Sequence, residues 1–318
     1  MNRRKFIKNA IIGTSGFILF STLIGGTKII YESSRIVKVE ENLGTSADLH
    51  SHAVVTYEGK PNLRELFDYC SRIGLDIIAF TNFADSRYED LKKTAISLPK
   101  KYEFQDLGRV FYVSDGNKLL TVVGGQEVPT KQGHILTVGA TSQIKNYKEM
   151  KETIEEAKDK DAIIIADHPF TSVWGGMGKE NLEKHLDDWD GIEFNSQNIT
   201  LIPFLLDQRK SNYEAEEFSK KYNIPLIATS DSHRLEEIAR SYITFKEKLG
   251  LMYDNRLISK LRSIIKSKNF DNVKRYNTWG SFVSWAVPFQ IKAKLGFYDK
   301  PKELEVGKNK AKALVFGL

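Results

Sequence analysis

The spacing of hydrophobic positions changes repeatedly along the chain from Ala47 onward. Short apolar runs, such as Ala162 to Ala166, have the length of buried strands. Longer amphipathic stretches lie between these runs, and in residues 62–73 the apolar positions recur at intervals of three and four, as on one face of a helix. This alternation predicts parallel β-α-β units.

The strand and helix patterns together predict an α/β barrel. The expected strands end at His50, Phe80, Gly124, Val138, Asp167, Phe194 and Ser230. The expected helices span residues 62–73, 147–158, 181–186 and 207–222. About seven strands alternating with helices indicate a closed or nearly closed barrel, in which the chemistry is expected at the C-terminal ends of the strands.

The first thirty residues differ from the rest of the chain. A basic start, Arg3-Arg4-Lys5-Phe6-Ile7-Lys8, leads into an apolar stretch from Ala10 to Gly26. A basic head followed by a moderate apolar segment is typical of an export signal. The paired arginines resemble the twin-arginine type, which exports folded proteins across bacterial membranes. We therefore expect an exported protein whose N-terminal segment is either cleaved or kept as a membrane anchor.

These patterns divide the chain into four parts. Residues 1–30 form the signal or anchor, and residues 31–46 form a linker. Residues 47–245 form the barrel, and residues 246–318 form a helical C-terminal appendage that carries an aromatic stretch from Trp279 to Phe297. The appendage is expected to pack on the barrel, with a membrane surface as the alternative.

Composition limits the classes of partner and of metal site. The 318 residues are 41% hydrophobic, enough for one large core, and carry a net charge of +6. This mild basicity fits a small anionic substrate or an acidic membrane surface, and without a long basic run no nucleic-acid polymer is expected. No protein partner is evident. The single cysteine, Cys70, excludes an intramolecular disulfide and a cysteine metal cluster, so a metal would be held by histidines and carboxylates.

Histidines gather at the predicted strand ends. Of the six in the chain, five lie at or just after such an end: His50, His52, His134, His168 and His233. An extended backbone points the two imidazoles of a His-x-His pair to the same face, where they can bind one ion. A single pair of this kind is more often an accident, but here the accident would have to recur. His185 follows no strand, and we expect it to be structural.

Carboxylates accompany these histidines. Glu127 follows the apolar run 119–123, Asp167 precedes His168, and Glu193 closes the run Gly191-Ile192-Glu193. A carboxylate that bridges two ions between imidazole ligands suits a multinuclear hydrolytic site. Mixed nitrogen and oxygen ligation favours Zn, Mn or Fe.

The ordered motifs resemble those of the PHP family, the polymerase and histidinol phosphatase superfamily of metal-dependent phosphoesterases. They are Asp48-Leu49-His50-Ser51-His52, Gly124-Gly125-Gln126-Glu127, Gly133-His134, Asp167-His168-Pro169, Gly191-Ile192-Glu193 and Ser230-Asp231-Ser232-His233. The resemblance implies a distorted (β/α)7 barrel that holds two or three metal ions. It implies these metal ligands: His50, His52, Glu127, His134, His168, Asp231 and His233. We place Asp231, His233 and Glu193 in the catalytic group.

One departure from the family pattern concerns the third metal. Where the family usually has threonine, aspartate and histidine, this chain has Thr81-Asn82-Phe83. Phenylalanine offers no lone pair, so we expect two tightly held divalent ions and a weak or empty third site. Glu58 lies near the place of another family ligand, and a solvated loop carboxylate is the alternative for it.

These observations favour an exported phosphoesterase. We expect it to hydrolyse a small phosphate ester, with nucleotides among the candidates, by a metal-activated hydroxide. A carbamate or amide hydrolase on the same metals is a second hypothesis, and a degenerate barrel that binds metal or ligand without turnover is a third. The glycine-rich loop around Trp174 is expected either to bind the substrate or to cover the barrel core.

Overall fold

The computed structural model describes residues 38–39, 44–52, 62–81, 87–172, 175–202, 206–278 and 280–281. The predicted export segment at residues 1–30 lies outside these ranges, as do Glu58, Asn82, Phe83, Trp174 and the aromatic residues after Ser281. Within the described ranges, no helix combines the length and the apolar character needed to cross a membrane.

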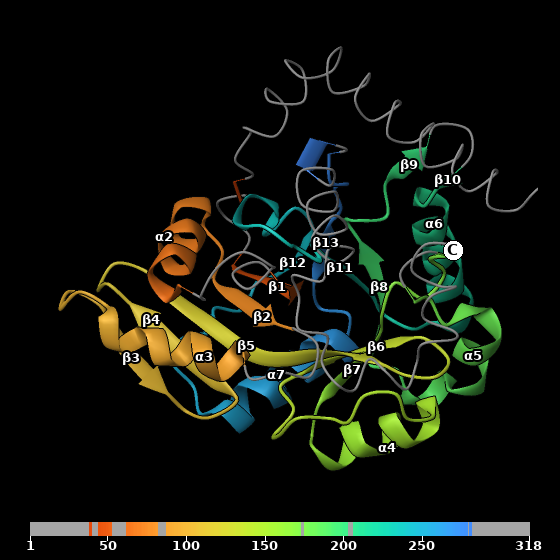
Figure 1. The fold of residues 1–318 in the computed structure, drawn as a ribbon, viewed down its shortest axis with the longest axis horizontal. Coiled ribbons are helices and arrows are strands. Elements are labelled where there is room, and N and C mark those ends of the chain that lie inside the picture. The colour runs from red at the N-terminus through yellow and green to blue at the C-terminus, as the bar shows by residue number, and fades with distance from the viewer. Residues whose placement is uncertain are drawn as a thin grey trace, which may run out of the picture.

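Strands and helices alternate through the described chain (Figure 1). The strands are β1 (Thr45–Ser51), β2 (Ile77–Phe80), β3 (Glu103–Asp106), β4 (Val110–Ser114), β5 (Leu119–Pro129), β6 (His134–Val138), β7 (Ile163–Ala166), β8 (Gly191–Asn195), β9 (Thr200–Ile202), β10 (Leu206–Asp207), β11 (Leu226–Thr229), β12 (Tyr242–Phe245) and β13 (Asp271–Val273). The α-helices are α2 (Leu63–Ile73), α3 (Arg87–Lys93), α4 (Met150–Asp159), α5 (Gly178–Lys184), α6 (Arg209–Tyr222) and α7 (Asp254–Lys266). Three short 3-10 helices are η1 (Thr94–Ser97), η2 (Leu186–Asp188) and η3 (Leu235–Glu237).

Seven of the described strands form the wall of a nearly closed barrel, in the order β11, β8, β7, β6, β5, β2, β1. The remaining seam, between β1 and β11, is bridged just beyond the end of β11, where Ser51 and Ser232 form a parallel bridge. The Asp231 amide donates to the His50 carbonyl at 2.9 Å, and the His52 amide donates to the Ser232 carbonyl at 2.7 Å. The residues that close the barrel are therefore those of the predicted site.

The predicted α/β barrel is confirmed, but the prediction of uniformly parallel units is wrong at β6. This strand runs antiparallel to both β5 and β7, whereas the other neighbouring wall strands pair in parallel. Only residues 130–133 connect β5 to β6, and a parallel connection needs a crossover of about a dozen residues or more. A hairpin is the arrangement that so short a turn permits.

One hydrophobic core fills the barrel. It combines side chains from six of the wall strands with the apolar face of α7: Ala47, Leu49, Ile77, Ala79, Val123, Leu136, Val138, Ile163, Ile165, Ile227, Leu257, Ile258, Leu261, Ile264 and Ile265. Residues from so many strands can meet only in the barrel interior, so the segment after Phe245 contributes a helix to the barrel's own core. β13 extends the sheet by pairing with β12, which is antiparallel to β1.

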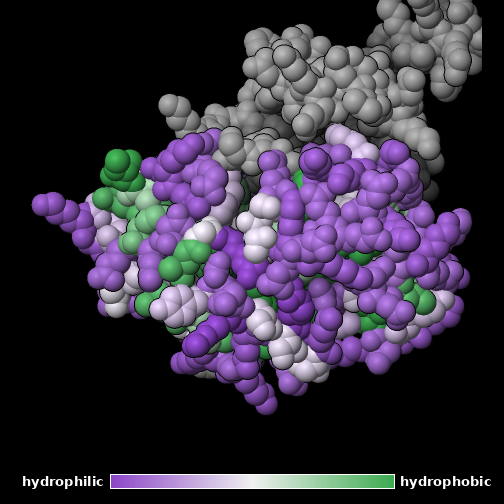
Figure 2. Space-filling model, turned by 90° about the horizontal axis from the view of Figure 1, so that it is seen from below, coloured by the Kyte–Doolittle hydropathy of each residue, from purple (hydrophilic) through white to green (hydrophobic). Residues whose placement is uncertain are grey.

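Helices cover the outside of the barrel wall. Leu66 and Phe67 of α2 pack in the same cluster as Phe80 of β2, and α4, α5 and α6 pack in a cluster with β7 and β8. The predicted helix at residues 62–73 matches α2, which begins after Asn62, whose side chain caps it, and ends at Gly74, where φ is 86°. The surface seen from below in Figure 2 is largely hydrophilic, as expected when the apolar faces point inward.

Candidate metal centre

Polar side chains replace aliphatic ones on the inward face of the wall strands near one mouth of the barrel. Leu136 of β6 and Ile165 of β7 belong to the interior core. His134 and Asp167 lie two residues away from them, toward the mouth, and side chains two apart on a strand share a face. The mouth is consequently lined by imidazoles and carboxylates above an aliphatic floor.

The five histidines predicted at strand ends come together there. Their ring centroids form a row with separations of 5.5 Å from His134 to His168, 6.3 Å from His168 to His50, 5.0 Å from His50 to His52 and 4.8 Å from His52 to His233.

An irregularity in β1 helps to direct its two histidines to the mouth. Between its pairings with Ile78 and Phe80 of β2, β1 contains one residue more than β2 does. A bulge of this kind locally changes which face a side chain points to. As a result, the Nε2 atoms of His50 and His52 lie 3.1 Å apart, and both side chains are buried.

A first group of ligand atoms surrounds these two imidazoles. Asp231 Oδ1 lies 3.4 Å from the Nε2 atom of His50 and of His52. Glu127 Oε2 lies 3.2 Å from His52 Nε2 and 3.9 Å from His50 Nε2. Atoms bound about 2.1 Å from a zinc ion at the corners of a tetrahedron are about 3.4 Å apart, so these separations fit a shared ion.

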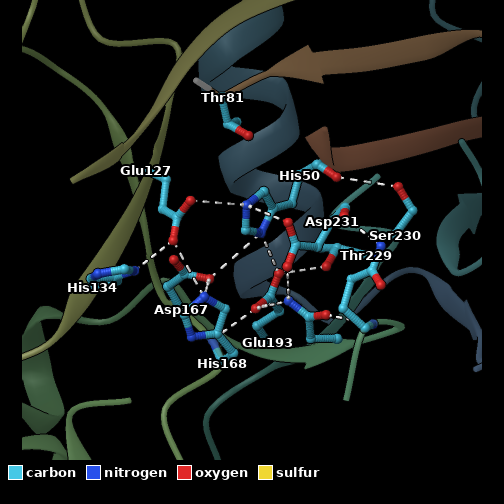
Figure 3. Close-up of polar contacts among 12 residues, drawn as sticks. His50, Thr81, Glu127, His134, Asp167, His168, Glu193, Thr229, Ser230 and Asp231 are labelled. Atoms are coloured by element: carbon cyan, nitrogen blue, oxygen red, sulfur yellow. Dashed lines mark hydrogen bonds and ion pairs between the residues drawn. The ribbon is translucent and has the colours of Figure 1, made fainter. Parts of the chain in front are cut away.

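A second group uses the other oxygen of Glu127. Glu127 Oε1 lies 2.5 Å from His134 Nδ1 and 3.3 Å from His168 Nε2, and Asp167 Oδ1 lies 3.4 Å from that same His168 atom. Figure 3 shows Glu127 between His134 on one side and His50 on the other. This carboxylate therefore presents one oxygen to each group, which is the arrangement of a bridging ligand.

His233 stands at the end of the row. Its Nε2 atom lies 3.4 Å from Asp231 Oδ1, and with His52 these residues form a further set of converging ligand atoms. The expectation of a weak third site rests on Glu58, Asn82 and Phe83, which lie outside the described ranges, so it stays a prediction.

The electrostatics of the mouth favour positive charge. Burial alone would lower the pKa of His50, but Asp231 and Glu193 raise it well above its usual value. The pKa of His168 is raised against burial in the same way, chiefly by Glu127. In the metal-free protein, protons on His50 and His168 thus compensate the carboxylates, and divalent ions would compete with those protons.

Glu193 is fully engaged in hydrogen bonds. Its oxygens accept from His50 Nδ1 at 2.7 Å, from the Thr229 hydroxyl at 2.5 Å, from the His168 amide at 2.7 Å and from Asn195 Nδ2 at 3.0 Å. Although burial opposes it, the charge of His50 lowers the pKa of Glu193 to about 2. These contacts favour a role in orienting His50, so that Nε2 faces the mouth. The prediction that Glu193 belongs to the catalytic group stays untested.

Buried amides hold the loop that carries Asp231. Asn195 Nδ2 donates to Asp231 Oδ2 at 3.0 Å, and Gln197 Nε2 donates to the Asp231 carbonyl at 3.0 Å. The His233 amide donates to Glu237 at 2.8 Å. Asp231 has a φ of 48°, and His168 has a φ of 23°, both rare for residues with a side chain. Such backbone geometry persists where surrounding contacts enforce it, as they do here.

Two acidic residues of the mouth were absent from the predicted ligand set. Asp48 accepts hydrogen bonds from the Ser230 amide at 3.1 Å and from the Ala239 amide at 2.9 Å. Burial raises the pKa of Asp48 to about 6. Burial and the nearby charge of Glu193 raise the pKa of Asp167 well above its usual value. The signal for Asp167 was its place two residues after the inward Ile165.

Comparison with known proteins finds a family model that matches one segment of the chain and a relative that matches part of its sequence. Residues 209–252 match the family model described as PHP-associated. The uncharacterized protein MJ0417 of Methanocaldococcus jannaschii is 24% identical over 143 residues, which are 42% of this chain and 57% of that protein, so the chain matches little more than half of this relative's length.

Among solved structures, PsfC from Pseudomonas syringae shares the fold, with a TM-score of 0.53 at 13% identity over 79% of this chain and 98% of that one. A Bacteroides vulgatus two-domain protein, described as containing a predicted PHP-like metal-dependent phosphoesterase, aligns with a TM-score of 0.49 at 16% identity, over 76% of this chain and 68% of that one.

The bridging position of Glu127 predicts that its replacement affects both ions. In Glu127→Gln an amide replaces the charged carboxylate with little change in size, so bound metal should fall from roughly two ions per chain to one or fewer. Metal analysis after dialysis of the purified protein measures this. His185→Ala is the control, because His185 pairs with Asp188 at 3.0 Å outside the row and should leave metal content unchanged. Two ions retained by Glu127→Gln would contradict the bridging assignment.

Proposed function

We propose that this protein is a metal-dependent hydrolase that cleaves a small anionic phosphate ester. The observation that carries the proposal is the position of Glu127, with Oε2 3.2 Å from His52 and Oε1 3.3 Å from His168. Glu127 and the histidines on its two sides would hold two divalent ions, which would activate water and stabilise the leaving oxygen. The match of residues 209–252 to a PHP-associated family supports the same reaction class.

The residues of this chain preorganise such a site. Glu193 holds His50 in one orientation, and Asn195 and Gln197 hold the side chain and the carbonyl of Asp231. Hydrogen bonds of this kind fix the ligand geometry before an ion binds, which increases affinity. The donor set of imidazoles and carboxylates fits Zn, Mn or Fe.

Access and charge favour a small anion as substrate. The row of imidazoles is buried in its middle, where His50 and His168 are at most 2% exposed, and it opens at its ends, where the side chains of His134 and His233 are 21% and 13% exposed. Arg234, which follows His233, has a partly exposed side chain. Together with a net charge of +6, this arrangement suits a phosphate group that enters at one of the two open ends of the row.

Loss of Asp231 tests the reaction. Asp231→Ala removes an oxygen that faces His50, His52 and His233, so hydrolysis of phosphomonoesters should fall by about a thousand-fold or more while the barrel stays folded. The measurement is kcat/KM on a panel of phosphomonoesters, phosphodiesters and aryl amides, with circular dichroism as the check on folding. His185→Ala again serves as the control.

The panel also separates the alternatives. Turnover of aryl amides or carbamates without phosphate esters would replace the proposed reaction by amide hydrolysis on the same ligands. Metal binding without turnover of any member would favour a binding protein. Near-normal turnover by folded Asp231→Ala would overturn the site assignment itself.

We also propose that the protein is exported by a twin-arginine route and meets the membrane through its N-terminal segment. Arg3 and Arg4 precede the apolar stretch from Ala10 to Gly26, and such a route depends on reading both guanidinium groups. The double variant Arg3→Lys and Arg4→Lys should therefore stay in the cytoplasm, as measured by cell fractionation against the unchanged chain. Full export of the double variant would exclude this route.

A further inference from the structure

Asp167 is a buried carboxylate that lacks a hydrogen-bond partner. Its side chain is 0% exposed, and its Oδ1 atom makes only ion pairs with His50 and His168, at 3.5 and 3.4 Å, whose geometry is not that of hydrogen bonds. Across the described ranges, no other buried carboxylate has an oxygen in this condition. Asp48, which is equally buried, accepts from the amides of Ser230 and Ala239. Buried polar groups are normally hydrogen-bonded, so we expect Asp167 to bind a group that does not belong to the protein, such as a metal ion.

The neighbours of Asp167 cannot supply that partner. Its Oδ1 atom lies 3.5 Å from His50 Nδ1, but that nitrogen contacts Glu193 at 2.7 Å. It lies 3.4 Å from His168 Nε2, which also faces Glu127 at 3.3 Å. The two oxygens of Glu193 already accept four hydrogen bonds. Asp167 therefore faces imidazoles that are already paired with other carboxylates, and burial and the negative charge of Glu193 beside it raise its pKa well above the usual value. A divalent cation would relieve this crowding of carboxylates.

We propose that Asp167 is the fourth protein ligand of the ion held by Glu127, His134 and His168. One ligand atom from each of these four residues lies within 4.8 Å of the other three, and Figure 3 shows Asp167 beside Glu127 and His168. Two imidazoles and two carboxylates would give an ion at this end of the row four protein ligands instead of three. This assignment rests on the proposed metal centre but not on the identity of the reaction.

Asp167→Asn tests the proposal because asparagine has the same shape and no charge. The metal-free variant should unfold at the same temperature as the unchanged protein or at a higher one, because no partner of the carboxylate is lost. On titration with Zn or Mn, one of two ions should bind at least about 10-fold more weakly, and the stabilisation that metal gives should shrink. Isothermal titration calorimetry and thermal unfolding with and without metal measure both effects.

Asp190→Asn is the matched control. Asp190 is also buried. It directly precedes β8, at the end of that strand away from the metal centre, where it accepts a hydrogen bond from the Ile164 amide at 2.9 Å and lies 3.1 Å from Lys266 Nζ. This variant should lose stability equally with and without metal and should bind both ions normally. A purely structural Asp167 would behave in the same way.

The outcomes separate this inference from the proposed function. If Asp167→Asn binds both ions with unchanged affinity, Asp167 is not a ligand, while the metal centre and the reaction stand. If the unchanged protein binds no ion at all, the metal centre fails and this assignment fails with it. Should the asparagine variant not fold, Asp167→Ser replaces it under the same expectation, since a smaller side chain relieves any crowding.

Discussion

The structure depends on one electrostatic constraint, which is that several carboxylates are buried together at the barrel mouth. Glu127, Asp167 and Glu193 are each at most 6% exposed in their side chains, and Asp231 is only slightly more exposed. Burying ionised carboxylates costs several kcal/mol each unless opposite charge accompanies them. In the metal-free protein His50, His52 and His168, whose pKa values are raised by the carboxylates, meet part of this need by binding protons. Asp167 has only long ion pairs with His50 and His168. Divalent ions bound at the mouth would balance the negative charge of these carboxylates.

The rest of the barrel keeps these groups in place. The aliphatic interior and α7 form a rigid floor beneath the mouth, and the seam between β1 and β11 closes through the backbone of His50, His52, Asp231 and Ser232. Ligation and barrel closure thus use the same short segments. The positive φ angles at His168 and Asp231 fit this view, because the hydrogen bonds of Glu193 and Gln197 hold that backbone.

Much of this arrangement follows from local sequence pattern. Buried strands are short aliphatic runs, so their ends were predictable to within a few residues, and the histidines that follow them were expected to meet at one mouth. The antiparallel orientation of β6 was not predicted, because it depends on the length of the turn between β5 and β6. An apolar run has the same pattern whether its strand is parallel or antiparallel to its neighbours. The special position of Asp167 could not be predicted, because a carboxylate becomes unpaired only through the three-dimensional placement of groups such as Glu193 and His50. In sequence, Asp48 and Asp167 look equivalent, and only their surroundings distinguish them.

The most direct test of the two-ion centre is anomalous X-ray diffraction from crystals of the purified protein grown with Zn or Mn, collected at the absorption edge of the metal. Two anomalous peaks are expected on opposite sides of the Glu127 carboxylate, one facing His50, His52 and Asp231 and the other facing His134, His168 and Asp167. A single peak, or peaks that do not contact Glu127, would contradict the two-ion centre.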